Sequence, residues 1–120
     1  MDFQLTKMQV VNLNFTEQKE GDSESDSRLR IDAVMEASDS NPRFARMLVT
    51  ASLQSPGRYD LNVDLAFIFK FEEKISREEI KNKLVDADTE RMLYPYINTF
   101  LTNFIINAGY PRPGIPLVLK

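Results

Sequence analysis

The stretch "YDLNVDLAFIFKF", residues 59 to 71, carries the clearest periodicity in the chain. Its alternate residues are all apolar: Tyr59, Leu61, Val63, Leu65, Phe67, Phe69 and Phe71. Polar residues, among them Asp60, Asp64 and Lys70, occupy most of the positions between them. Because successive side chains of a strand point to opposite faces of a sheet, this alternation predicts a long strand with one face buried in a core or an interface.

Three further strands are predicted before this one. Residues 3 to 15, "FQLTKMQVVNLNF", predict a strand partly buried on both faces, and residues 28 to 36 predict a half-exposed one. In the first of these, the period-2 pattern assigns Phe3, Leu5, Val11, Leu13 and Phe15 to one face and Met8 and Val10 to the other. Residues 43 to 54 predict a third strand, joined to residues 59 to 71 by the turn "SPG". Short connections favour antiparallel hairpins, so the first 72 residues predict a four-stranded antiparallel meander.

An acidic segment separates the first two strands. Residues 16 to 27, "TEQKEGDSESDS", contain five acids, one lysine and no apolar anchor, which predicts a solvated loop. The run "DSESD" could in principle bind a divalent cation, because such ions prefer clustered oxygen ligands. It lacks the remaining ligands of a calcium loop, so the solvated loop is the favoured interpretation.

Two helices are predicted after the strands. Ser76 and Glu79 have the spacing of a capping box, which predicts a short helix, and a longer helix should begin near Pro95 and end before Gly109. The apolar side of the short helix would carry Ile80, Leu84 and Ala87. After the long helix, a proline-rich tail should be irregular, with Leu117, Val118 and Leu119 docking on the fold. The predicted fold class is therefore α+β, with one short and one long C-terminal helix packed on the sheet.

Composition narrows the function. A chain of 120 residues with 42% hydrophobic and 28% charged residues predicts one globular domain, residues 1 to 120. The net charge of -3 argues against nucleic-acid binding, and apolar runs far below about 20 residues argue against membrane insertion. We therefore expect a cytoplasmic protein.

The chain has no cysteine and no histidine. This removes thiolate nucleophiles, imidazole bases and Cys/His metal sites, and no carboxylate, lysine or hydroxyl group lies in a catalytic motif. Its four glycines are scattered and form no phosphate loop. We expect no enzymatic activity, no catalytic residue, no metal site, no cofactor and no use of ATP.

The predicted long helix has more apolar surface than one sheet face requires. Ile97, Leu101, Phe104 and Ala108 form one stripe, and Phe100 and Ile105 widen it. Apolar surface that a single chain cannot cover predicts a partner layer, and hence a homo-oligomer.

Several motifs, in order, resemble the bacterial export chaperone SecB and its SecB-like relatives. They are the first strand "FQLTKMQVVNLNF", "LVTASL" at 48 to 53, "LYPY" at 93 to 96, "GYP" at 109 to 111 and "IP" at 115 to 116. Together they touch nearly the whole chain. The resemblance implies a four-stranded antiparallel sheet with the long helix on one face. It also implies an eight-stranded dimer paired through the first strands, and a tetramer of two dimers stacked through their helices.

The resemblance also implies a function. It indicates an ATP-independent holdase that binds unfolded polypeptide or preprotein clients through exposed apolar grooves, for protein export or for one dedicated client such as an antitoxin. The motor SecA is a possible partner, although a chain ending at Lys120 without a Cys/His zinc tail argues against it. The alternative is a non-catalytic oligomeric adaptor on the same fold that binds one folded protein. A small-ligand binder or enzyme has no motif in its favour.

Candidate residues follow from the chemistry of such a surface. Aromatic rings and flexible methionines suit an adaptable groove, so the candidate client-binding residues are Met92, Tyr94, Phe100 and Tyr110. Core or subunit interface remains the alternative for each of them. The candidate interface residues are Phe3, Leu5, Ile97, Leu101, Phe104 and Ile105, of which the four on the helix could equally be core.

Overall fold

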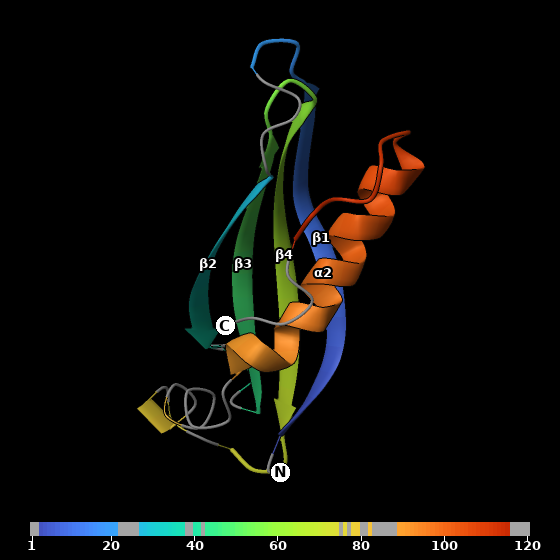
Figure 1. The fold of residues 1–120 in the computed structure, drawn as a ribbon. Helices are drawn as coiled ribbons and strands as arrows, with labels where there is room; N and C mark the ends of the chain where they lie inside the picture. The colour runs from blue at the N-terminus through green and yellow to red at the C-terminus, as the bar shows by residue number, and fades with distance from the viewer. Residues whose placement is uncertain are drawn as a thin grey trace.

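A computed structural model describes residues 3–21, 27–37, 40–41, 43–74, 76, 78–79, 82 and 89–115. Four antiparallel strands form one sheet, and one helix crosses a face of it diagonally (Figure 1). The elements are β1 (Phe3–Glu17), β2 (Arg28–Ala37), β3 (Phe44–Ser55), β4 (Tyr59–Phe71) and α2 (Thr89–Asn107). All four predicted strands are therefore confirmed, as are the antiparallel sheet and the long helix.

The order of the strands differs from the prediction. The sheet runs β1-β4-β3-β2, so the predicted meander, in which β1 would pair with β2, is wrong. Strands β2, β3 and β4 are consecutive neighbours, whereas β1 lies on the far side of β4, as in a Greek key. The connection between β1 and β2 is long enough to cross the end of the sheet. In this arrangement the apolar side chains of β1 lie beside those of β4. The two edges of the sheet are β1 and β2.

Strand β1 does not keep a constant side-chain alternation. Its register with β4 shifts twice, between Leu5 and Lys7 and between Val10 and Asn12. As a result Met8 lies opposite Phe67 and Val10 lies opposite Leu65, on the same face of the sheet as Phe3. The prediction that Met8 and Val10 occupy the other face is wrong, because each irregularity inserts one residue and reverses the alternation.

The core lies between the sheet and α2. The predicted apolar face of β4 is almost completely buried, which confirms its role as the centre of the fold. Alternate residues of β3 extend this face, and α2 covers it with Leu93, Ile97, Leu101 and Ile105. At the β1 edge, the Phe3 ring lies 5.7 Å from Phe69 and 5.5 Å from Phe71, measured between ring centroids.

Helix α2 begins six residues earlier than predicted. Pro95 lies inside it rather than at its first position, so the predicted start near Pro95 is wrong. A proline inside a helix removes one backbone donor and costs about 3 kcal/mol. The extra turns persist because Thr89 and Leu93 are buried, and their packing offsets this local cost. Tertiary contacts therefore decide where the helix begins.

The C-terminal end of α2 is the predicted one. Gly109 has a φ of 98° and follows the last helical turn. Its N–H donates to the carbonyl of Ile106 at 3.1 Å, and the N–H of Tyr110 donates to that of Ile105 at 3.1 Å. These two hydrogen bonds form a Schellman motif, which satisfies carbonyls that the helix end would leave unpaired.

Replacing Gly109 with alanine should lower the free energy of unfolding by about 1–2 kcal/mol. A Cβ at this position meets no atom within 4 Å, so the cost comes from the left-handed backbone conformation alone. Chemical denaturation of the two proteins measures it. The matched control is Gly114→Ala, where a Cβ also has open space and φ is not in the left-handed region. Equal effects of the two substitutions would contradict this explanation.

Only the start of the predicted short helix falls within the described residues, which contain one helical element, α2, and not the predicted pair. The N–H of Glu79 donates to Ser76 Oγ at 3.2 Å, and the N–H of Ser76 reaches Glu79 Oε1 at 3.5 Å, which are the contacts of the predicted capping box. Ile80, Leu84 and Ala87 lie outside the described residues, as do residues 22–26 of the acidic segment and Leu117, Val118 and Leu119. Within the described ranges, α2 is the one helix of full length.

Candidate functional site

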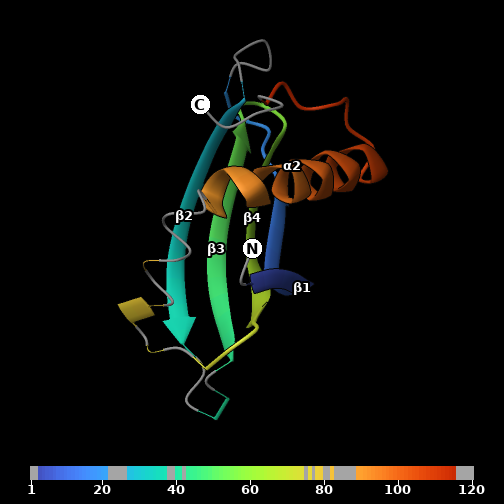
Figure 2. The ribbon, with the colours of Figure 1, turned by 90° about the horizontal axis from the view of Figure 1, so that it is seen from below.

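An apolar groove lies between edge strand β2 and the N-terminal half of α2. It encloses a volume of about 90 Å³. In Figure 2 this half of the helix passes in front of β3 and beside β2. The lining residues are Ile31, Ala33, Met47, Val49, Glu90, Leu93, Tyr94 and Ile97. We call this feature the β2–α2 groove.

The local sequence explains why the groove exists. Residues of β2 alternate between the two faces of the sheet, and Ile31 and Met35 face the helix but remain half-buried because β2 is an edge strand. Ala33 lies between them on β2, and its small side chain leaves space between this strand and α2. Glu90 is exposed and is the one charged residue of the lining. The groove can therefore accept apolar side chains while its mouth remains polar.

An aromatic cluster packs at the C-terminal end of α2. The ring of Tyr110 lies 5.0 Å from Tyr59 and 5.8 Å from Phe15, and Phe15 lies 5.4 Å from Phe104, all between centroids. Burial raises the pKa of Tyr59 above its usual value, although hydrogen bonds to the Ser55 and Ser27 side chains partly oppose the shift. Tyr110 therefore contributes to the packing of the last helical turn against β1 and β4.

The structure separates the four candidate client-binding residues. Tyr94 lines the β2–α2 groove but is only 2% exposed, and Met92 is half-buried two positions earlier on the helix. Phe100 is half-buried and stacks on Phe104 at 6.4 Å, whereas Tyr110 belongs to the aromatic cluster at the opposite end. The four residues do not form one site in the single chain, and their role in client binding stays a prediction.

Most candidate interface residues lie in the core of the single chain. Ile97, Leu101 and Ile105 are buried against the sheet, and Phe3 is buried at the β1 edge. Leu5 and Phe104 are half-buried and keep some surface for a partner. The interface role of all six residues stays a prediction.

The outer face of α2 was missed by the sequence analysis. Tyr96 is 49% exposed and Ile106 is 46% exposed, and their spacing of ten residues places them on the same side of the helix. Exposed Thr99 and Asn103 lie between them. Residues 92–111 contain no charged side chain, and this absence was the signal available in the sequence. We call Tyr96, Thr99, Asn103 and Ile106 the outer face of α2.

The molecule exposes more surface than a compact monomer of its mass. Its accessible surface is 7780 Å², whereas a 13.8 kDa monomer is expected to expose about 6,600 Å². Its radius of gyration is 16.3 Å, against about 14 Å for a compact 120-residue domain. The single chain is therefore less compact than a typical monomer of its length.

The helix-free face of the sheet is mixed in character. Val34 on β2 is 60% exposed, and Leu48 opposite it on β3 is half-buried. An exposed ion pair lies next to them, with Arg46 Nε 3.0 Å from Glu36 Oε2. Exposed pairs of this kind contribute at most about 1 kcal/mol to the stability of the fold.

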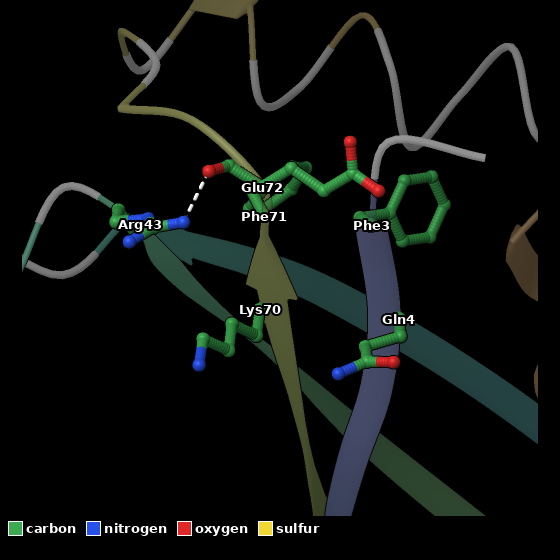
Figure 3. Close-up of a pocket in the computed structure, with 6 residues that line it drawn as sticks. All are labelled: Phe3, Gln4, Arg43, Lys70, Phe71 and Glu72. Carbon is green, nitrogen blue, oxygen red and sulfur yellow. Dashed lines mark hydrogen bonds between the residues drawn. The ribbon is translucent and has the colours of Figure 1, made fainter.

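A second hollow of about 220 Å³ lies where β1, β3 and β4 meet (Figure 3). Its lining residues are Phe3, Gln4, Arg43, Lys70, Phe71 and Glu72. The Arg43 guanidinium donates to the Glu72 carbonyl, and the Glu72 carboxylate lies on the other side of the hollow from Arg43 and Lys70 (Figure 3). Opposite charges therefore face the same space, which favours no single class of ion. No group of three acidic side chains within the described ranges could hold a metal ion.

Comparison with known proteins shows the fold. No protein-family model matches the sequence, and no curated protein matches it. The structure is similar to the Mycobacterium tuberculosis SecB-like chaperone Rv1957, solved in complex with a ChAD peptide from the Rv1956 HigA1 antitoxin. The TM-score is 0.79 at 12% sequence identity, over 99% of this chain and 91% of that chain. The chain therefore has the SecB-like fold. Among the described residues, no helix combines the length and the hydrophobicity needed to cross a membrane.

Proposed function

We propose that this protein is an ATP-independent chaperone that holds unfolded polypeptides in its β2–α2 groove. The observation that carries the proposal is an apolar groove that opens at edge strand β2 of a SecB-like sheet, beside which the described residues place no further strand. The peptide-bound state of the similar chaperone supports a polypeptide as the occupant. An apolar groove without a specific polar constellation fits clients of varied sequence, and we place this activity in the cytoplasm.

Each groove binds weakly by itself. Covering about 300 Å² of apolar surface contributes roughly 7 kcal/mol. Ordering the flexible client consumes much of this free energy. A chaperone built on such grooves therefore needs several of them, because a second segment of the same client then binds at a high effective concentration.

An oligomer supplies these repeated grooves. The outer face of α2 presents Tyr96 and Ile106 on a helix side without charges, which suits contact with another apolar helix. We propose a dimer or tetramer in which the outer faces of α2 pack together, with edge strand β1 as a second contact.

The second candidate is an adaptor that binds one folded protein. The observation in its favour is the exposed Val34 and the neighbouring Leu48 on the helix-free face, away from the groove. An adaptor should retain one folded partner at a fixed stoichiometry, whereas a holdase should retain a range of unfolded chains. Affinity purification from cells followed by mass spectrometry separates the two functions.

An aggregation assay tests the holdase function. A several-fold molar excess of the protein should slow the aggregation of a chemically denatured protein without nucleotide. Ala33→Glu should weaken this effect, because it places an unpaired charge in the groove at an exposed position. The matched control is Val34→Glu, the adjacent residue on the opposite face of the same strand. Undiminished aggregation at several-fold excess of the wild-type protein would contradict the proposal.

A further inference from the structure

The chain after α2 turns back along the helix. Residues 110–115, "YPRPGI", form neither helix nor strand. In Figures 1 and 2 they leave the C-terminal end of α2 and return toward β4, so they run opposite to the helix. Pro113 is buried, and Ile115 is half-buried against the core. This returning segment is therefore part of the packed fold.

One side of α2 is buried although it does not face the sheet. Asn98 is 8% exposed and Thr102, one turn later, is 6% exposed. Thr102 follows Leu101, so its side chain points about 100° away from the residue that packs on the strands. Its hydroxyl donates to Asn98 Oδ1 at 3.3 Å. The returning segment accounts for the burial of this side, because it passes along the helix.

The same side of α2 is exposed in its N-terminal half. Two residues lie seven positions before Asn98 and Thr102, which is about two helical turns, and both are exposed. They are Arg91 and Pro95. Tyr94, one turn before Asn98, lines the β2–α2 groove. The cover that the returning segment supplies therefore ends where the groove begins.

The next five residues of the chain are long enough to fill the groove. Residues 116–120, "PLVLK", follow the returning segment and lie outside the described residues. Five residues in an extended conformation span about 17 Å. Helix α2 rises by about 12 Å between Asn98 and Glu90, the lining residue closest to the start of the helix. The segment can therefore reach the far end of the groove.

The sequence of this segment suits the groove. Leu117 and Leu119 are two positions apart, so in an extended segment both side chains point to the same side. Lys120 follows them, and Glu90 is the one charged residue of the lining. Prolines at positions 111, 113 and 116 restrict the backbone and reduce the conformational entropy that docking would cost.

We propose that residues 116–120 occupy the β2–α2 groove of their own chain and compete with the polypeptide client. This inference rests on the proposed function and adds its regulation. A tethered segment is present at an effective concentration of about a millimolar, so even weak docking closes most grooves. The apparent Kd of a client equals its intrinsic Kd divided by the fraction of open grooves. A single short apolar segment is thereby excluded, whereas an unfolded chain that engages several grooves displaces the tail.

Disulfide trapping tests the docking without a client. The chain has no cysteine, so two introduced cysteines form a unique pair. With copper–phenanthroline as oxidant, Ala33→Cys/Lys120→Cys should form a disulfide within one chain, which peptide mass spectrometry and a non-reducing gel detect. The matched control is Val34→Cys/Lys120→Cys, on the opposite face of the same strand, and should form at least about tenfold less. Equal yields in the two variants, no disulfide in the first, or a disulfide between two chains would overturn the inference.

Affinity measurements test the competition. The probe is reduced, carboxymethylated α-lactalbumin, a permanently unfolded chain. Leu117→Ser/Leu119→Ser should bind it about fivefold or more tightly than the wild-type protein, because more grooves are open. Val34→Ser, an apolar-to-serine change on the helix-free face, should stay within about twofold.

The oxidised Ala33→Cys/Lys120→Cys protein should bind the probe at least about tenfold more weakly and recover on reduction. Unchanged or weaker affinity of the double serine variant would overturn the inference. Failure of both this variant and the wild-type protein to bind the probe would instead reject the proposed function, and the disulfide yields would still report on the docking.

Discussion

Leu101→Ala should lower the free energy of unfolding by about 3–4 kcal/mol. The Leu101 side chain is 0% exposed and lies in the core that joins α2 to the sheet. Truncation to alanine loses the burial of the removed carbons and leaves a cavity between helix and strands. Single domains are stable by only about 5–15 kcal/mol, so this change removes a large share of the total.

Urea denaturation of the wild-type protein and the variant at equal chain concentration measures this loss. Equal concentration matters because association stabilises a folded chain by mass action. Gln54→Ala is the control, because Gln54 is exposed on β3 and lies outside the outer face of α2. It should change the free energy of unfolding by no more than about 0.5 kcal/mol. A loss below about 1 kcal/mol for Leu101→Ala would mean that α2 does not pack on the sheet as described.

The double substitution Tyr96→Glu and Ile106→Glu should break the proposed contact between the outer faces of α2 and lower the mass of the oligomer, which is built from 13.8 kDa chains. In the proposed assembly both side chains are buried between the outer faces of α2 of two chains. An unpaired carboxylate in such a contact costs about 2 kcal/mol or more. Two of them weaken association by roughly a thousandfold, which is enough to dissociate an oligomer at micromolar concentration.

Sedimentation velocity of the wild-type and variant proteins measures the mass of each assembly. Val34→Glu is the control, because it places the same charge at a residue of similar exposure on the helix-free face, and it should leave the oligomer intact. An unchanged mass of the double variant would place this contact elsewhere, whereas a lower mass of the control would place a contact on the helix-free face.

The sequence predicts the elements of this fold well. The strict alternation of residues 59 to 71 defines β4, and the glycine at position 109 ends α2 as expected, because both signals depend on residues that are near one another in the chain. Strand order is a different kind of property. The pairing of β1 with β4 rather than β2 depends on contacts between distant residues, and a long connecting segment permits either arrangement.

Two local errors have physical causes. The register shifts in β1 reverse the faces of Met8 and Val10, and nothing in a period-2 pattern indicates where an extra residue is inserted. Proline is favoured at the first helical position, so the sequence predicts a helix start at Pro95, but burial of Leu93 extends the helix to earlier residues. In both cases tertiary packing decides between conformations that the local sequence allows.

The candidate site was only partly accessible from sequence. Tyr94 was identified as a candidate and does line the groove, but the opposite wall is formed by Ile31 and Ala33, which appeared only as part of a half-exposed strand. Their importance depends on β2 being an edge strand beside the N-terminal half of α2, which requires the strand order and the helix start. A sequence prediction with the wrong strand order or the wrong helix start therefore cannot locate the groove.

The central claim is that this protein recognises the unfolded state of other chains. The most direct measurement titrates labelled α-lactalbumin with the protein, once in its native form and once after reduction and carboxymethylation, and follows fluorescence anisotropy. We predict binding of the unfolded form with a Kd of about 10 µM or tighter and binding of the native form at least about a hundredfold weaker. Equal affinity for the two forms, or no binding of the unfolded form at about 100 µM protein, would contradict the account.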